Sequence, residues 1–249
     1  MHDYISIKSD HLEIVSSKPS DASALAKIIE SMGIRTHVTD SLILPKSKVL
    51  LYKYKKIIDQ KIISQIGSSN IINLHNGKLP EYRGLHALSW MIQNGESIGV
   101  LTLHEVEPTI DTGAIISEFK FDIGKQMDIN DAQKIVAEAL KIWLPNEVIR
   151  WFHNEKTAKR NPRKLYRIYP EKNDNNFFDK KWKIREAINL IRAVNPPYGP
   201  GAIYQDKYQD TRVVVAFSQE STEYIEKNST GTIKCNLSDG VLEFNILPM

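Results

Sequence analysis

Short apolar runs alternate with amphipathic segments along the first part of the chain. Four runs rich in branched apolar residues predict strands, at residues 11–17, 35–40, 47–54 and 70–76. Between them, residues 20–33 place apolar side chains at helical spacing, begin with Ser and Asp, and stop at Gly33. Residues 59–67 predict a shorter helix that is likewise closed by a glycine.

The alternation continues to about residue 156. It predicts a helix at 84–96, strands at 100–107 and 114–123, and a long helix at 129–156 that Pro145 is expected to interrupt. Strands that alternate with helices favour βαβ units. The predicted fold class is therefore α/β, with a Rossmann-like, mainly parallel sheet and helices on both faces.

After residue 155 the pattern changes. Residues 156–181 are basic and rich in Asn and Pro, and we predict a linker there. A helix at 181–199, ended by two prolines and a glycine, leads into four or five short strands. We therefore predict a catalytic domain at 1–155, a basic linker at 156–181 and a small β-rich domain at 182–249.

Composition narrows the class of protein. Of the 249 residues 41% are hydrophobic and 25% are charged, which is ordinary for a soluble globular chain. No apolar run approaches the roughly 18 residues of a membrane-spanning helix, and charges break up the N-terminal residues, so no signal peptide is expected. The single cysteine, Cys235, excludes an internal disulfide and a CxxC zinc motif. These features predict a cytoplasmic protein.

The charge is mildly basic. A formal net charge of +3 suits an anionic substrate and lies far from that of a dedicated nucleic-acid binder. Six basic residues without an acid lie between Lys156 and Arg167. This segment is either a solvated linker or a surface that meets phosphate groups.

Residues 73–84, with the sequence NLHNGKLPEYRG, are the densest candidate for chemistry. Asn73 and His75 lie two apart on a predicted strand, so their side chains point to the same face. The carboxyl ends of parallel strands are where α/β folds place their sites. Asp111 follows His75 by thirty-six residues, and a carboxylate on such a later loop can orient an imidazole.

These residues carry a resemblance to a known family. The pattern N-x-H-x-x-x-L-P-x-Y-R-G, a helix ending in N-G-E, His104 and I-D-T-G at 110–113 resemble the core of the formyltransferases. That family includes methionyl-tRNA, glycinamide ribonucleotide and sugar-nucleotide formyltransferases, which use N10-formyltetrahydrofolate. The close match covers about residues 70–125, and residues 191–202 resemble the entry to the C-terminal β-domain of the tRNA and sugar enzymes.

The resemblance implies an acyl transfer without a metal ion. Asn73 and His75 would hold the formyl oxygen as it gains charge, His75 would accept the amine proton, and Asp111 would orient His75. The implied cofactor contacts are Tyr54, Ile57, Arg83 and Gly113, although the sequence favours Arg83 slightly more as a structural anchor for its loop than as an anion contact. His104 is interpreted as a structural residue on its strand, and His86 as the start of a helix.

The acceptor amine is predicted from what the chain lacks. The methionyl-tRNA enzymes carry a basic insertion after the loop that corresponds to LPEYRG, and this chain lacks it. The glycinamide ribonucleotide enzyme lacks a C-terminal β-domain, whereas this chain has a β-rich segment there. We therefore expect a nucleotide-linked amino sugar, of dTDP or UDP type, destined for O-antigen or lipopolysaccharide. Candidate contacts to this substrate are Asn76, Gly77, Lys78, Lys159, Arg160 and Arg163.

Two features depart from the family pattern. Asn76 and Gly77 stand where Pro-Ser is usual, which puts amine recognition in question more than the chemistry. The N-terminal part is also shortened by about one βα unit and has no glycine-rich turn after its first strand.

Three alternatives remain at this point. A methionyl-tRNA formyltransferase-like enzyme would keep the chemistry and change the acceptor. The D-T-G motif also occurs in aspartic proteases, which need two copies or a symmetric dimer. The β-rich segment could bind nucleic acid as an OB-like barrel does, but it has few basic residues. Homodimerisation through this segment is left open.

Overall fold

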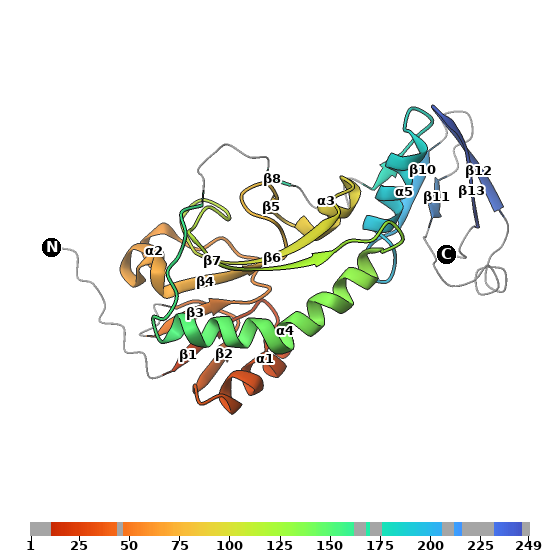
Figure 1. Cartoon of the computed structure of the whole chain (residues 1–249). Helices are drawn as coiled ribbons and strands as arrows, with labels where there is room; N and C mark the ends of the chain where they lie inside the picture. Colours follow the sequence, from red (N-terminus) through yellow and green to blue (C-terminus); the bar gives the residue numbers. More distant parts are fainter. Residues whose placement is uncertain are drawn as a thin grey trace. The chain divides into compact units, whose positions relative to one another are not determined.

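The computed structural model describes residues 11–43, 47–161, 168–169, 176–205, 212–215 and 232–245 (Figure 1). The chain divides into two compact units, neither of which is one stretch of sequence. The first comprises residues 1–84, 100–120 and 136–167, and the second comprises residues 85–99, 121–135 and 168–249. The domain boundaries predicted at residues 155 and 181 stay predictions.

A six-stranded sheet forms the centre of the first unit. In spatial order its strands are β2 (Thr36–Thr39), β1 (Leu12–Val15), β3 (Lys48–Leu51), β4 (Ile71–His75), β6 (Ile98–Glu105) and β7 (Ile115–Asp122). The strands from β2 to β4 are parallel, whereas β6 pairs with β4 in the antiparallel sense. The predicted α/β fold with a mainly parallel sheet is confirmed.

Apolar side chains cover both faces of this sheet. Leu50 and Ile72 face a core formed with α1 (Pro19–Ser31) and the end of α4 (Ile129–Phe152). Val49 and Ile71 face a second core with α2 (Gln60–Ile66), which the 3-10 turn η1 (Ser68–Asn70) joins to β4. Figure 1 shows α1 and α4 on one side of the strands. Alternation of side chains along each strand explains why these strands are apolar without a break.

The long helix α4 continues through Pro145, so the predicted interruption is wrong. Proline removes one backbone donor and usually kinks or breaks a helix. Here Leu144 and Val148 on either side of it are fully buried in the core with α1. Burial of such side chains contributes about 1.5–3 kcal/mol each, enough to offset one lost hydrogen bond.

The helix ends differ in how well the sequence predicted them. The helix α1 begins at Pro19 with Lys18 as N-cap, so Ser20 and Asp21 lie inside its first turn. The helix α2 is closed by Gly67 at φ +87°, as predicted, and the structure adds an N-terminal cap from the Asp59 carboxylate. Between β4 and β6 the chain also forms a short strand, β5 (Arg83–Gly84), which is not part of the six-stranded sheet.

The second unit holds short strands, two complete helices and the first residues of α4. The helices α3 (Ala87–Gln93) and α5 (Ile184–Ala193) pack together, and His86 is the N-cap of α3. Its strands are β8 (Ile168–Tyr169), β9 (Phe177–Phe178), β10 (Ala202–Gln205), β11 (Arg212–Val215), β12 (Thr232–Leu237) and β13 (Gly240–Asn245). The last four confirm the predicted run of short strands. No helix in the described ranges is long and apolar enough to cross a bilayer.

Candidate active site

The end of β4 positions the two polar residues of the motif. Asn73 and His75 lie on the face of the sheet that packs against α2, since Ile71 on the same face belongs to that core. The neighbouring strand β6 places His104 directly opposite Asn73 and Thr102 directly opposite His75. His75 is buried and Asn73 is half-buried. The predicted placement of both side chains on one face is confirmed.

Asp111 reaches this strand end from the loop between β6 and β7. Its backbone is left-handed, with φ +52°, and the Asn161 side-chain amide donates to the Asp111 and Gly113 carbonyl oxygens, both at 3.1 Å. A Cβ on Gly113 would lie 1.8 Å from the carbonyl oxygen of Glu105. Only glycine therefore allows the loop to cross β6 this closely.

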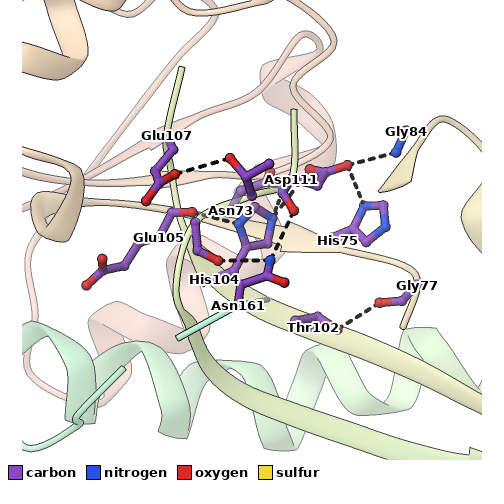
Figure 2. Close-up of polar contacts among 12 residues, drawn as sticks. Asn73, His75, Gly77, Gly84, Thr102, His104, Glu105, Glu107, Asp111 and Asn161 are labelled. Carbon is purple, nitrogen blue, oxygen red and sulfur yellow. Dashed lines mark hydrogen bonds and ion pairs between the residues drawn. The ribbon is translucent and has the colours of Figure 1, made fainter. Parts of the chain in front are cut away.

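The Asp111 carboxylate lies between two imidazoles (Figure 2). Its Oδ2 is 3.5 Å from Nδ1 of His75 and accepts the backbone N–H of Gly84 at 2.8 Å. Its Oδ1 is 3.5 Å from Nε2 of His104. One carboxylate therefore contacts both histidines and also holds the loop that leads into β5.

The charges of the site follow from these contacts. Burial alone would raise the pKa of Asp111, but the neighbouring His75 and His104 rings and the Gly84 N–H together hold that pKa well below its usual range. Burial lowers the pKa of His75, against the opposing effect of Asp111. At neutral pH we therefore expect a charged carboxylate beside a neutral His75 ring, the state in which a histidine can accept a proton.

The loop of residues 76–82, which joins β4 to β5, is held at two further points. The Nε2 of His75 hydrogen-bonds the carbonyl oxygen of Tyr82, and since a carbonyl only accepts, Nε2 carries the proton. In the neutral ring Nδ1, which faces Asp111, is then the nitrogen that can take up a proton. The Thr102 hydroxyl donates to the Gly77 carbonyl oxygen at 2.7 Å. Both ends of the loop are thus tied to the sheet.

The expected cofactor contacts differ in character. Tyr54 is half-buried against the core beneath α2, whereas the Ile57 side chain is 79% exposed in the loop after β3. An exposed isoleucine is available to pack on a flat ligand ring. Arg83 is buried, and Gly113 makes the close crossing described above. Their roles toward a folate stay predictions.

The expected substrate contacts lie on two segments. Asn76 is half-buried and Gly77 is buried, while exposed Lys78 forms an ion pair with Glu81 at 3.1 Å. Lys159 and Arg160 are exposed and come directly before Asn161, whose side chain holds the Asp111 loop. Lys159 also pairs with Ile115 through two backbone hydrogen bonds. Arg163 lies outside the described residues.

Sequence reasoning missed the roles of two residues in this cluster. His104 was expected to be structural, yet it contacts both Asn73 and Asp111. The available signal was its position on the strand that pairs with β4. Asn161 lies in the basic segment, where nothing in the sequence distinguishes it from its neighbours.

Comparison with known proteins finds that part of this chain is similar to a known family. Residues 35–148 match the family described as formyl transferase. The bifunctional polymyxin resistance protein ArnA of Wigglesworthia glossinidia brevipalpis is 28% identical over 158 residues, which are 62% of this chain and 23% of that protein. This chain thus matches only about a quarter of the length of that curated relative.

Solved structures share the fold at low sequence identity. An N-formyltransferase from Helicobacter canadensis, in complex with folinic acid and dTDP-3-aminofucose, has a TM-score of 0.71 and 16% identity over 97% of this chain and 100% of that one. A 4-N formyltransferase from Francisella tularensis has a TM-score of 0.72 and 19% identity over 85% of this chain and 98% of that one. At these identities the likeness establishes the fold.

Proposed function

We propose that this chain, whose residues 35–148 match the formyl transferase family, transfers a formyl group from N10-formyltetrahydrofolate to a nucleotide-linked amino sugar. The observation that carries the proposal is the grouping of Asn73, His75 and Asp111 at the carboxyl end of β4. It combines a hydrogen-bond donor, a neutral proton acceptor and a charged carboxylate, which are the groups that acyl transfer to an amine needs.

In the first step the amine lone pair attacks the formyl carbon. The carbonyl π electrons move to oxygen, and a side-chain N–H of Asn73 stabilises this oxyanion. Removal of one such donor typically costs about 10²–10³-fold in rate. A half-buried amide serves this role better than water because it is oriented before the reaction and screened from bulk solvent.

In the second step the proton leaves the attacking nitrogen and His75 accepts it. With Nε2 held by the Tyr82 carbonyl oxygen, the proton is taken up at Nδ1, beside the charged Asp111 carboxylate. The bond between the formyl carbon and N10 then breaks, and N10 receives the proton. The net change is one amine hydrogen exchanged for a formyl group, with tetrahydrofolate as the second product.

The remaining predicted residues are assigned to the two substrates. Tyr54 and Ile57 are proposed to pack against the folate ring, with Arg83 and Gly113 beside it. Lys78, Lys159 and Arg160 are exposed cations that suit a diphosphate, and Asn76 and Gly77 lie next to His75 in the loop. Arg163 belongs to the same proposal.

The amino-sugar acceptor is supported by the relatives. The Helicobacter canadensis protein was crystallised with dTDP-3-aminofucose, and the Francisella tularensis protein is described as a 4-N formyltransferase. We propose a dTDP- or UDP-linked 3- or 4-amino sugar for this chain, in the cytoplasm, with the product used for O-antigen or other lipopolysaccharide sugars.

The test is a transfer assay with the purified protein. N10-formyltetrahydrofolate is offered with dTDP- and UDP-linked 3-amino and 4-amino sugars, and separately with Met-tRNA, while product mass and tetrahydrofolate release are followed. We expect a gain of one formyl group on an amino sugar. His75→Ala should abolish it, whereas His37→Ala, which removes an exposed histidine of β2, should not. Turnover with Met-tRNA alone would overturn the acceptor, and no turnover with any amine would overturn the function.

A further inference from the structure

A third side chain, His104, completes the contacts around Asn73. The antiparallel register of β4 and β6 sets the two residues directly opposite each other, so their Cβ atoms lie on the same face. The Nε2 of His104 is 3.1 Å from the Asn73 amide nitrogen (Figure 2). His104 is 2% exposed, so water does not compete for this contact.

The tautomer of His104 follows from its other ring nitrogen. Nδ1 lies 2.7 Å from the carbonyl oxygen of Glu105. That oxygen has no proton to give, so Nδ1 is the donor and the neutral ring presents Nε2 as an acceptor. An acceptor at Nε2 requires the Asn73 amide to direct its nitrogen, and not its oxygen, toward the ring.

This contact leaves the amide with one orientation. One N–H of the Asn73 carboxamide is used by His104, and the second N–H is fixed in the same plane. Without the imidazole, the carboxamide could rotate about its last bond and present oxygen in place of nitrogen, because terminal amide torsions are broad. A formyl oxyanion would then meet an acceptor, which repels it.

We propose that His104 is a positioning residue for formyl transfer, because its Nε2 fixes the Asn73 carboxamide with an N–H directed at the formyl oxygen. This inference rests on the proposed function. It assigns His104 no contact with the substrate and no exchange of protons with it.

Two substitutions separate positioning from simple packing. In His104→Gln the side-chain amide reaches the place of Nε2 and its oxygen can accept the Asn73 N–H. In His104→Asn the shorter amide reaches only the place of Nδ1. We expect His104→Asn to lower kcat about 10²-fold at nearly unchanged KM for the folate, the cost of a misplaced catalytic group. His104→Gln should recover most of that loss. Equal losses in the two variants would overturn the proposal.

A double-mutant cycle tests whether His104 acts through Asn73. If it does, adding His104→Asn to Asn73→Ala produces little further loss, because the group to be positioned is already absent. If the fold-loss of the double variant equals the product of the two single fold-losses, His104 acts independently of Asn73 and the proposal is overturned. The cycle requires an active wild-type enzyme, so absence of formyl transfer in the wild type is recognised separately as failure of the proposed function.

A measurement without turnover completes the test. Nitrogen-15 NMR of the wild-type histidines reports which ring nitrogen carries the proton. We expect His104 with a protonated Nδ1 and an unprotonated Nε2, and a changed Asn73 side-chain amide resonance in His104→Asn. A protonated Nε2 at neutral pH would overturn the proposal even if the protein proved to have another activity.

Discussion

The Oδ2 of Asp111 lies 3.5 Å from Nδ1 of His75 and accepts the backbone N–H of Gly84 in the same arrangement. A single carboxylate oxygen therefore connects His75, at the end of β4, to Gly84 in β5, where the intervening loop ends. Its charge supports a proton on His75, and its hydrogen bond fixes the loop. The consequences of removing that charge can be distinguished from those of removing the hydrogen bond.

Asp111→Asn should lower kcat by about 10²–10⁴-fold, because that is the rate enhancement that a positioned general base typically contributes and His75 depends on Asp111 for this role. The amide oxygen of Asn can still accept the Gly84 N–H, so the fold should persist. Because the pKa of Asp111 is depressed in the folded state, its contribution to stability is present above the unfolded pKa of about 3.9 and is lost as the pH falls below it. Urea unfolding across acid pH should therefore vary less in the variant. An unchanged kcat would contradict the assigned role.

The activity should decline on the acid side as His75 takes up a proton. Since burial lowers the pKa of His75, the midpoint of this decline should lie below the usual value of about 6.5. Stability should also fall as the pH drops through 6.5, because the unfolded chain binds a proton there that the folded ring does not. The pH dependence of kcat/KM and of urea unfolding, in the wild type and in His75→Gln, checks both. If the decline in activity has its midpoint above about pH 6.5, the charge of Asp111 affects the pKa of His75 more than burial does, which would contradict this prediction.

Gly113→Ala should disrupt the loop that carries Asp111. The added methyl group would lie 1.8 Å from the Glu105 carbonyl oxygen, so the backbone of the loop must move. We expect a loss of about 1–3 kcal/mol in the free energy of unfolding and a large loss of activity. The matched control is Gly124→Ala, where the added group meets no atom within 4 Å. Equal behaviour of the two variants would contradict this account of the D-T-G glycine.

Lys48→Met should weaken the attachment of α4 to the sheet. The buried ammonium of Lys48 donates to the carbonyl oxygens of Trp151 and Phe152, at 3.0 and 3.2 Å, at the end of that helix. Each hydrogen bond from a charged group contributes about 1.5–3 kcal/mol, so we expect a loss of several kcal/mol measured by urea unfolding. Lys120→Met, at an exposed ion pair with Glu118, should cost less than about 1 kcal/mol.

Joint replacement of Lys159 and Arg160 by Gln should weaken binding of the nucleotide sugar. Each lost contact to phosphate is worth about 1.5–3 kcal/mol, so KM for that substrate should rise at least about tenfold with kcat nearly unchanged. The effect should shrink at high salt, because exposed charges are screened. Lys27→Gln, on the exposed face of α1, provides the control. A KM equal to that of the wild type would place the diphosphate elsewhere.

Local patterns predicted most of the elements of the first unit. Strands with both faces buried are continuous apolar runs, and helix ends such as Asp59 and Gly67 carry their own chemical signals. Pro145 shows where such reasoning fails, because the burial of Leu144 and Val148 against distant segments outweighs a local preference. That outcome depends on packing, which a local pattern does not contain.

The sequence by itself determined the fold class, the position of Asn73 and His75 on one face of a strand, and the family motif that adds Asp111. These follow from the side-chain period of a strand and from residue order. Only the tertiary structure decided that His104 faces Asn73 and that Asn161 holds the Asp111 loop. Both contacts join segments far apart in the chain. Their geometry is fixed by strand register and by loop crossing, which depend on how the whole sheet assembles.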